Sequence, residues 1–168
     1  MKTLCLFLAS LLILVSVIIG CEQNNNTVPE SNVNLPKLKA EWEREYTAWK
    51  SLQIQNYEFT FNLEGISQTI TVKNGNFQSA IDFHSGEPGK PHFKTIDALF
   101  DSIGNDFLIN EKQIFLPGQI GTCFSVRYDP VYHYPAKYDL VNKFDKKYGF
   151  IGGNGFTIEI LDFTIHEK

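Results

Sequence analysis

Apolar residues recur with the period of a helix in two separate parts of the chain. Over residues 37–50 they are spaced four, four and three positions apart, and charged side chains fill most of the remaining positions. This period predicts an amphipathic helix, and Pro36 suits its start because proline has no N–H to leave unpaired there. A second stripe runs over residues 96–107, where Thr95 can cap the first turn and Asp97 adds favourable negative charge. The sequence therefore predicts two helices.

Elsewhere the apolar period falls to two, which predicts half-buried strands. Asn74-Gly75 lies between two such runs and indicates a hairpin, because both residues tolerate positive φ. In the last run the apolar register changes near Ile160-Leu161, which indicates a β-bulge. Residues 108–122 are apolar in patches and stay ambiguous. The predicted strands span residues 57–63, 69–73, 76–83, 124–128, 136–141 and 156–165.

The order of these elements is helix, strand, hairpin, helix, hairpin and final strand. Two short helices cannot enclose a sheet, so we expect them on one face. The predicted fold class is α+β, with an antiparallel sheet of about five to six strands and two helices on one of its faces. Both halves follow a helix-then-strands plan, but no residue-level repeat indicates a duplication.

The first twenty residues differ from the rest of the chain. Lys2 precedes an apolar run over residues 4–19, the layout of a secretory signal. The segment Val17–Cys21 resembles the lipobox of bacterial lipoproteins, although Ile18 stands where leucine is usual. That resemblance implies that residues 1–20 are a lipoprotein signal peptide and that Cys21 carries a diacylglycerol and often a further acyl chain. A spanning helix and a cleaved soluble product are the alternatives.

A polar segment follows the cysteine. Residues 21–36 read as the lipidated Cys21 and a tether with a root-mean-square span of roughly 20 Å if flexible. Residues 37–168 then read as a single globular α+β domain, since such a length suits one domain. Two or three acyl chains attach a protein stably to a membrane. Glu22 favours the outer membrane if the source is Gram-negative, and otherwise we expect the outer face of the cell membrane.

Charge and cysteine content narrow the function classes. The net charge is −4 and the aromatic content is 14%, which argues against a disordered chain and against a nucleic-acid reader with a basic footprint. With Cys5 in the leader and Cys21 lipidated, only Cys123 remains in the domain. No internal disulfide is then available, and a buried, inert thiol is the expected state of Cys123.

The richest polar-aromatic cluster follows the fourth predicted strand. Tyrosine combines a rigid contact area with a hydrogen-bonding tip, so such a cluster is typical of a recognition surface. The alternative is that Tyr128 and Tyr134 face the core while Asp129 caps a turn. The candidate binding surface consists of Tyr128, Asp129, Tyr132, His133 and Tyr134.

Two groups could serve an enzyme instead. Asp82 and His84 on one face of a strand, with His92 across a loop, could hold zinc with an open position. A polar strand edge followed by a solvated loop is the favoured explanation of the same residues. Asp129 and His133 could form an acid–base pair, but no nucleophile lies in an activating context. Gly152-Gly153-Asn154-Gly155 reads as a flexible turn, not a phosphate loop. We therefore expect no metal, cofactor or catalytic residue.

Several segments occur in an order typical of one family. They are Trp49 followed by Tyr57–Phe61, then Ile70–Gly75, Thr95–Asp101 and Val126–Tyr138. Over roughly residues 40–165 the chain resembles a family of bacterial lipoproteins and secreted proteins known only as a domain of unknown function. Two departures are the absence of a Cys-x-Cys pair after the first strand and His133 in place of a glycine. The resemblance implies an envelope-attached α+β domain and names no catalytic group.

The sequence thus predicts a membrane-anchored, non-enzymatic envelope lipoprotein that binds a protein or peptide partner and no nucleic acid. We expect partner binding because of the aromatic cluster and because the edges of an open antiparallel sheet can accept an added strand. The alternatives are an envelope hydrolase or metal-binding enzyme using Asp82, His84 and His92 or Asp129 and His133, and a structural surface antigen without a dedicated ligand.

Overall fold

The computed structural model describes residues 35–145, 147 and 154–166. The predicted signal peptide, the predicted lipidation site Cys21, the expected tether up to residue 34, and Gly152 and Gly153 of the glycine-rich turn lie outside this part of the chain, whereas Asn154 and Gly155 belong to the last strand. The elements are α1 (Leu35–Ser51), β1 (Tyr57–Leu63), β2 (Ile66–Lys73), β3 (Asn76–Asp82), α2 (Ile96–Glu111), β4 (Gln119–Tyr128), β5 (Pro135–Phe144) and β6 (Asn154–Ile165).

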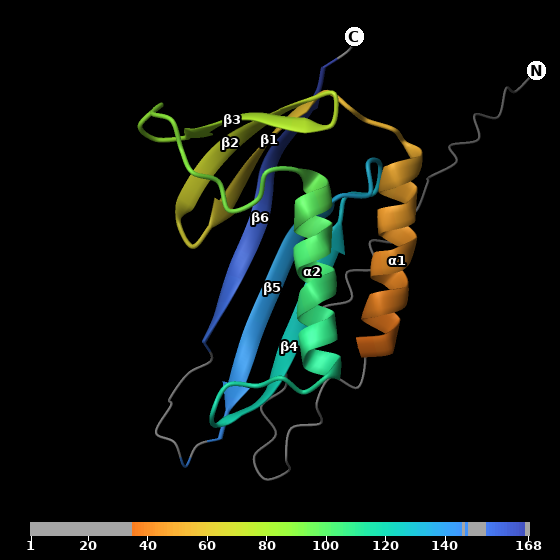
Figure 1. The fold of residues 1–168 in the computed structure, drawn as a ribbon, viewed down its shortest axis with the longest axis vertical. Coiled ribbons are helices and arrows are strands. Elements are labelled where there is room, and N and C mark those ends of the chain that lie inside the picture. Colours follow the sequence, from red (N-terminus) through yellow and green to blue (C-terminus); the bar gives the residue numbers. More distant parts are fainter. Residues whose placement is uncertain (1–34, 146, 148–153, 167–168) are drawn as a thin grey trace, which may run out of the picture.

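The six strands form one antiparallel sheet in the order β3-β2-β1-β6-β5-β4. Each half of the chain contributes three consecutive strands, and α2 carries the chain from the edge strand β3 to the opposite edge strand β4. Both helices lie on the same side of the sheet (Figure 1). The α+β class, the antiparallel sheet and the placement of the helices on one face are therefore confirmed.

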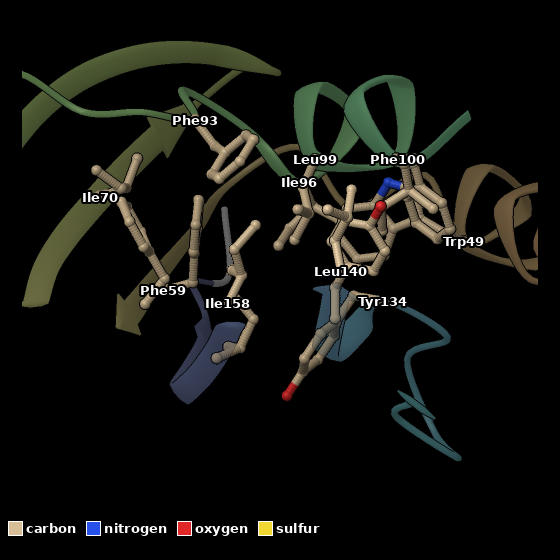
Figure 2. Packing of buried hydrophobic residues seen from close by; sticks show 14 of the residues in the cluster. Trp49, Phe59, Ile70, Phe93, Ile96, Leu99, Phe100, Tyr134, Leu140 and Ile158 are labelled. Atoms are coloured by element: carbon tan, nitrogen blue, oxygen red, sulfur yellow. The ribbon is translucent and has the colours of Figure 1, made fainter. Parts of the chain in front are cut away.

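An aromatic core fills the space between the helices and the sheet. Side chains of both helices and of β1, β2, β5 and β6 meet in one layer (Figure 2). Tyr57, Phe59 and Phe61 alternate along β1 and are each only 1% exposed. The Tyr57 hydroxyl accepts a hydrogen bond from the Ile96 N–H at 3.2 Å, and burial raises the pKa of Tyr57 to about 12. This bond ties the central strand to the start of α2.

The two helices pack side by side in antiparallel directions. Lys39 near the start of α1 pairs with Glu111 at the end of α2 at 2.8 Å, and Lys50 pairs with Asp97 at 2.9 Å. The start of the first helix and the end of the second therefore lie at the same end of the domain.

Among the described residues, neither helix is long and apolar enough to span a bilayer.

The closest approach of the helices is at Trp42. Its indole Nε1 donates a hydrogen bond to the Phe100 carbonyl at 3.0 Å, and its ring lies over Gly104. A Cβ atom at position 104 would lie 2.7 Å from Trp42 Cζ2. Glycine usually weakens a helix interior, but here its missing side chain makes room for the indole.

Element boundaries differ from the prediction where polar or turn residues masked the pattern. α1 begins at Leu35, and this side chain is 7% exposed, so the core includes one residue of the expected tether. β2 begins at Ile66, because Glu64 and Gly65 both adopt positive φ and form a tight hairpin with β1. The Asn74-Gly75 hairpin is confirmed.

The predicted bulge in the last strand is also confirmed. Thr60 pairs with Asp162 whereas Phe61 pairs with Ile160, so Leu161 is the extra residue. The bulge lets Ile160 and Phe163 both reach the core side of the sheet. A change of apolar register in a strand sequence therefore marked a real change in strand pairing.

Gly104→Ala should destabilise the protein by about 1–3 kcal/mol, because the new methyl group overpacks against an indole that its hydrogen bond holds in place. Urea unfolding measures the change. Asn105→Ala is the control, since residue 105 is exposed on the same helix and alanine favours helix there. Equal or higher stability of Gly104→Ala would contradict the close Trp42 contact.

Candidate functional site

The aromatic turn, residues 128–134, points most of its rings into the protein. Tyr134 is 8% exposed, and its ring lies 4.6 Å from that of Phe163. Tyr132 contacts the same phenylalanine at 5.5 Å, and Tyr128 stacks on Phe100 at 6.1 Å. The rings that looked like a recognition surface are therefore largely packed against β6 and α2.

The pKa values of two of these tyrosines are raised by burial. Burial raises the pKa of Tyr134 to about 12. It raises the pKa of Tyr128 far above its usual value, with a further increase from Glu41 and Glu45 on α1. The Tyr128 hydroxyl is buried and, within the described residues, has no hydrogen-bond partner. Of the two interpretations of the cluster, the core interpretation describes Tyr128 and Tyr134.

Asp129 holds the aromatic turn together. Its Oδ1 accepts hydrogen bonds from the N–H groups of Val131 at 2.9 Å and Tyr132 at 2.7 Å, and its carbonyl accepts from the His133 N–H at 3.0 Å. An aspartate that accepts from backbone groups two and three residues on is a turn-forming residue. Its carboxylate is thus engaged by the backbone of the turn.

His133 faces α1. Its backbone adopts a positive φ of 64°, and its Nδ1 lies 2.7 Å from Glu45 Oε2. Arg44 bonds the other oxygen of Glu45 through its Nη2 at 2.6 Å. Asp129 and His133 do not form the acid–base pair considered as an alternative, because the imidazole bonds to Glu45 and the Asp129 carboxylate bonds to backbone N–H groups.

Asp82, His84 and His92 do not converge. β3 ends at Asp82, so His84 lies outside the strand. The expectation that Asp82 and His84 lie on one face of a strand is therefore wrong. Asp82 Oδ1 accepts from the Ser85 N–H at 2.8 Å, the Ser85 hydroxyl at 2.9 Å and the His84 N–H at 3.1 Å, and these bonds lower its pKa. Both histidines are exposed. Nowhere in the described ranges do three or more histidine, cysteine, aspartate or glutamate residues gather as metal ligands.

The two edges of the sheet differ. The loop after β3 folds back on that strand, where Gly89 N–H donates to the Ala80 carbonyl at 2.8 Å and Asp82 N–H to the Glu87 carbonyl at 2.9 Å. A bridge between Ile81 and Pro88 continues this cover. At the opposite edge, β5 is the one strand in the described part that pairs with β4. Within the described residues, β4 is therefore the open edge of the sheet.

An apolar surface lies where the sequence pattern was ambiguous. We call it the apolar end surface, and its members are large aliphatic side chains that remain exposed at the end of α2, in the following segment and at the start of β4. Ile114 is 62% exposed and Leu116 is 58% exposed. Beside them Asn110, Gln113, Phe115 and Ile120 line a hollow of about 210 Å³. The apolar end surface consists of Leu108, Ile109, Ile114, Leu116 and Ile120.

Replacing His133 separates its side-chain bond from its backbone conformation. His133→Ala and His133→Gly both lose the contact with Glu45, but glycine adopts a positive φ without the penalty that a Cβ carries. His133→Gly should therefore be more stable than His133→Ala by about 1 kcal/mol. Urea unfolding of both variants measures the difference, and equal stabilities would argue against the left-handed backbone at this position.

Comparison with known proteins gives one match. A family model described as a family of unknown function, DUF6174, matches residues 41–145. No curated protein and no solved structure matches the chain. The matched region begins within α1 and ends after β5, so β6 lies outside it. It includes the contact between the two helices and the aromatic turn. Because it covers more than half of the sequence, the chain belongs to the DUF6174 family, a family of unknown function.

Proposed function

We propose that the protein is a lipid-anchored bacterial envelope protein whose domain is a non-catalytic module for a protein or peptide partner. The anchor part of this proposal rests on the leader and on the Val17–Cys21 segment, with Cys21 as the lipidated residue. The proposed location is the outer membrane in a Gram-negative source and otherwise the outer face of the cell membrane. Attachment there would confine the domain to partners near the bilayer surface.

The observation that carries the binding role is the open edge of β4. This strand is ten residues long, and its inner neighbour β5 is the one described strand that pairs with it. An exposed strand edge presents unpaired N–H and C=O groups that an extended peptide can complete as an added strand. The edge of β3 is a poorer candidate because its own loop covers it.

Side chains along β4 suit recognition. Cys123, Ser125 and Arg127 alternate with the core residues of the strand, and so they stand on the face away from the helices. Arg127 lies 3.7 Å from Glu159 on β6 and is largely exposed. In strand addition, main-chain bonds provide affinity and such alternate side chains provide specificity. These three side chains form a polar, weakly basic row on β4, and the side chains of an added strand would have to complement it.

The aromatic turn is no longer the main support for binding. Its tyrosines pack inward, and Asp129 and His133 each serve the turn or α1. The two enzymatic alternatives also have less support. Asp82, His84 and His92 do not gather as metal ligands in the described part of the chain, and Asp129 and His133 bond to other partners.

Photo-crosslinking tests the edge. A photoreactive amino acid at Ser125 should crosslink to a partner in intact cells, because this exposed side chain lies in the middle of β4. Ser79 is the matched control, since it is an exposed serine in the opposite edge strand. Adducts from Ser125 and none from Ser79 are expected. Equal adducts from both sites, or none from Ser125, would contradict binding at the β4 edge.

The anchor is tested by Cys21→Ser. The serine hydroxyl cannot form the thioether that joins the lipid, so acyl-lipid labelling should be lost and the protein should leave the membrane fraction. Cys123→Ser is the control because its thiol lies within β4. Retained membrane association and an unprocessed leader in both variants would show that the protein is not a lipoprotein.

A further inference from the structure

We propose that the apolar end surface inserts into the headgroup region of the bilayer that holds the anchor, so that the domain sits on the membrane in one orientation. This inference rests on the proposed lipidation of Cys21. It adds a second contact, made by the folded domain, to the contact made by the acyl chains. The occupant of the surface is thus the anionic lipid bilayer itself.

Position is the first argument. The folded chain begins at Leu35, and the ion pair of Lys39 with Glu111 places this start beside the end of α2. The apolar end surface begins at that same end of α2 and continues into the following segment. Figure 1 shows the start of α1 and the segment after α2 at the same end of the molecule. The anchor segment therefore joins the domain close to this surface.

Chain length sets how far the surface can lie from the anchor. Fourteen peptide units separate Cys21 from Leu35, and at about 3.3–3.6 Å per residue they can span at most about 50 Å. An anchored Cys21 thus keeps the start of α1 within about 50 Å of its lipid, so the apolar end surface beside that start can reach the membrane. The aromatic turn lies at the other end of β4, about 30 Å away for a ten-residue strand.

Exposure is the second argument. Leu108 and Ile109 are 43% and 37% exposed, and Ile114 and Leu116 are more exposed still. Five exposed aliphatic side chains fall within residues 108–120, and exposed apolar patches mark protein or membrane contacts. The fold does not need these side chains, because the core of α2 consists of Ile96, Leu99, Phe100, Ile103 and Phe107.

Charge is the third argument. Lys37 and Lys112 are exposed at this end, and Lys143 lies beside it, paired in the sheet with Gly121. The two nearby acidic side chains are already neutralised, because Glu111 pairs with Lys39 at 2.8 Å and Asp145 pairs with Lys147 at 3.1 Å. Basic residues around an apolar surface favour anionic lipid headgroups. This pattern fits an anionic bilayer better than an uncharged groove, and the position of the anchor favours the bilayer over an acidic protein.

The test places a polarity-sensitive fluorophore on the full-length, lipidated chain. Leu116→Cys carries the probe within the apolar end surface, and Val131→Cys is the matched control, because Val131 is 63% exposed in the aromatic turn. Both variants carry Cys123→Ala, and lipidated Cys21 has no free thiol. The chain is reconstituted on vesicles of phosphatidylethanolamine and phosphatidylglycerol, with and without lipids that carry a spin-label quencher in the upper acyl chain.

Blue-shifted emission and lipid quenching at position 116, with neither at position 131, are the expected results. Vesicles of phosphatidylcholine alone should weaken the quenching at 116, because they remove the anionic headgroups. A chain that stays on the vesicles but shows no quenching at 116 would overturn the docking inference and leave the anchor intact. If the protein purified from cells carries no acyl lipid and does not sediment with vesicles, the proposed anchor itself is overturned.

Two other occupants give distinct signals. If a second copy of the chain covers the surface, the blue shift at 116 will appear without vesicles and will rise with protein concentration. If the chain's own N-terminal segment covers it, the shift will be independent of concentration and insensitive to lipid quenchers. Either result would overturn insertion into the bilayer. Ile114→Glu in the probe variant should abolish quenching without lowering the unfolding midpoint, since residue 114 is exposed.

Discussion

The contact of Trp42 with Gly104 is the constraint on which the arrangement of the domain depends. Two helices fit side by side on one face of the sheet only if their axes approach closely, and the bare backbone at 104 allows this. The indole then bonds to the Phe100 carbonyl, and Tyr46 stacks on Phe100 at 4.6 Å. Because the helices are antiparallel, the start of α1 lies beside the end of α2, where Lys39 pairs with Glu111.

Two surfaces follow from that arrangement. With both helices on one face, the other face of the sheet carries most of the polar residues of the strands, and no other described strand pairs with the outer edge of β4. With the start of α1 beside the end of α2, the proposed anchor segment would join the domain next to the apolar end surface. The proposed membrane contact thus includes the start of β4, and the proposed partner edge runs along that strand away from it.

Local period and turn chemistry predicted most of the fold, because helices and hairpins depend on residues near in sequence. The bulge at Leu161 was visible for the same reason. The candidate site was less predictable, since alternation in a strand does not say which face is buried. The bond of His133 to Glu45 joins residues 88 positions apart, and no local pattern marks it. The apolar end surface escaped prediction because its residues follow neither period.

The central claim is that the domain rests on the bilayer through the end where its anchor enters. Hydrogen exchange of the lipidated chain on anionic vesicles, compared with the chain in detergent-free buffer after enzymatic removal of the lipid, tests this claim most directly. The account predicts slower exchange on vesicles in peptides covering residues 108–120 and unchanged exchange in those covering 128–134. Unchanged exchange over residues 108–120, or equal slowing in both regions, would contradict it.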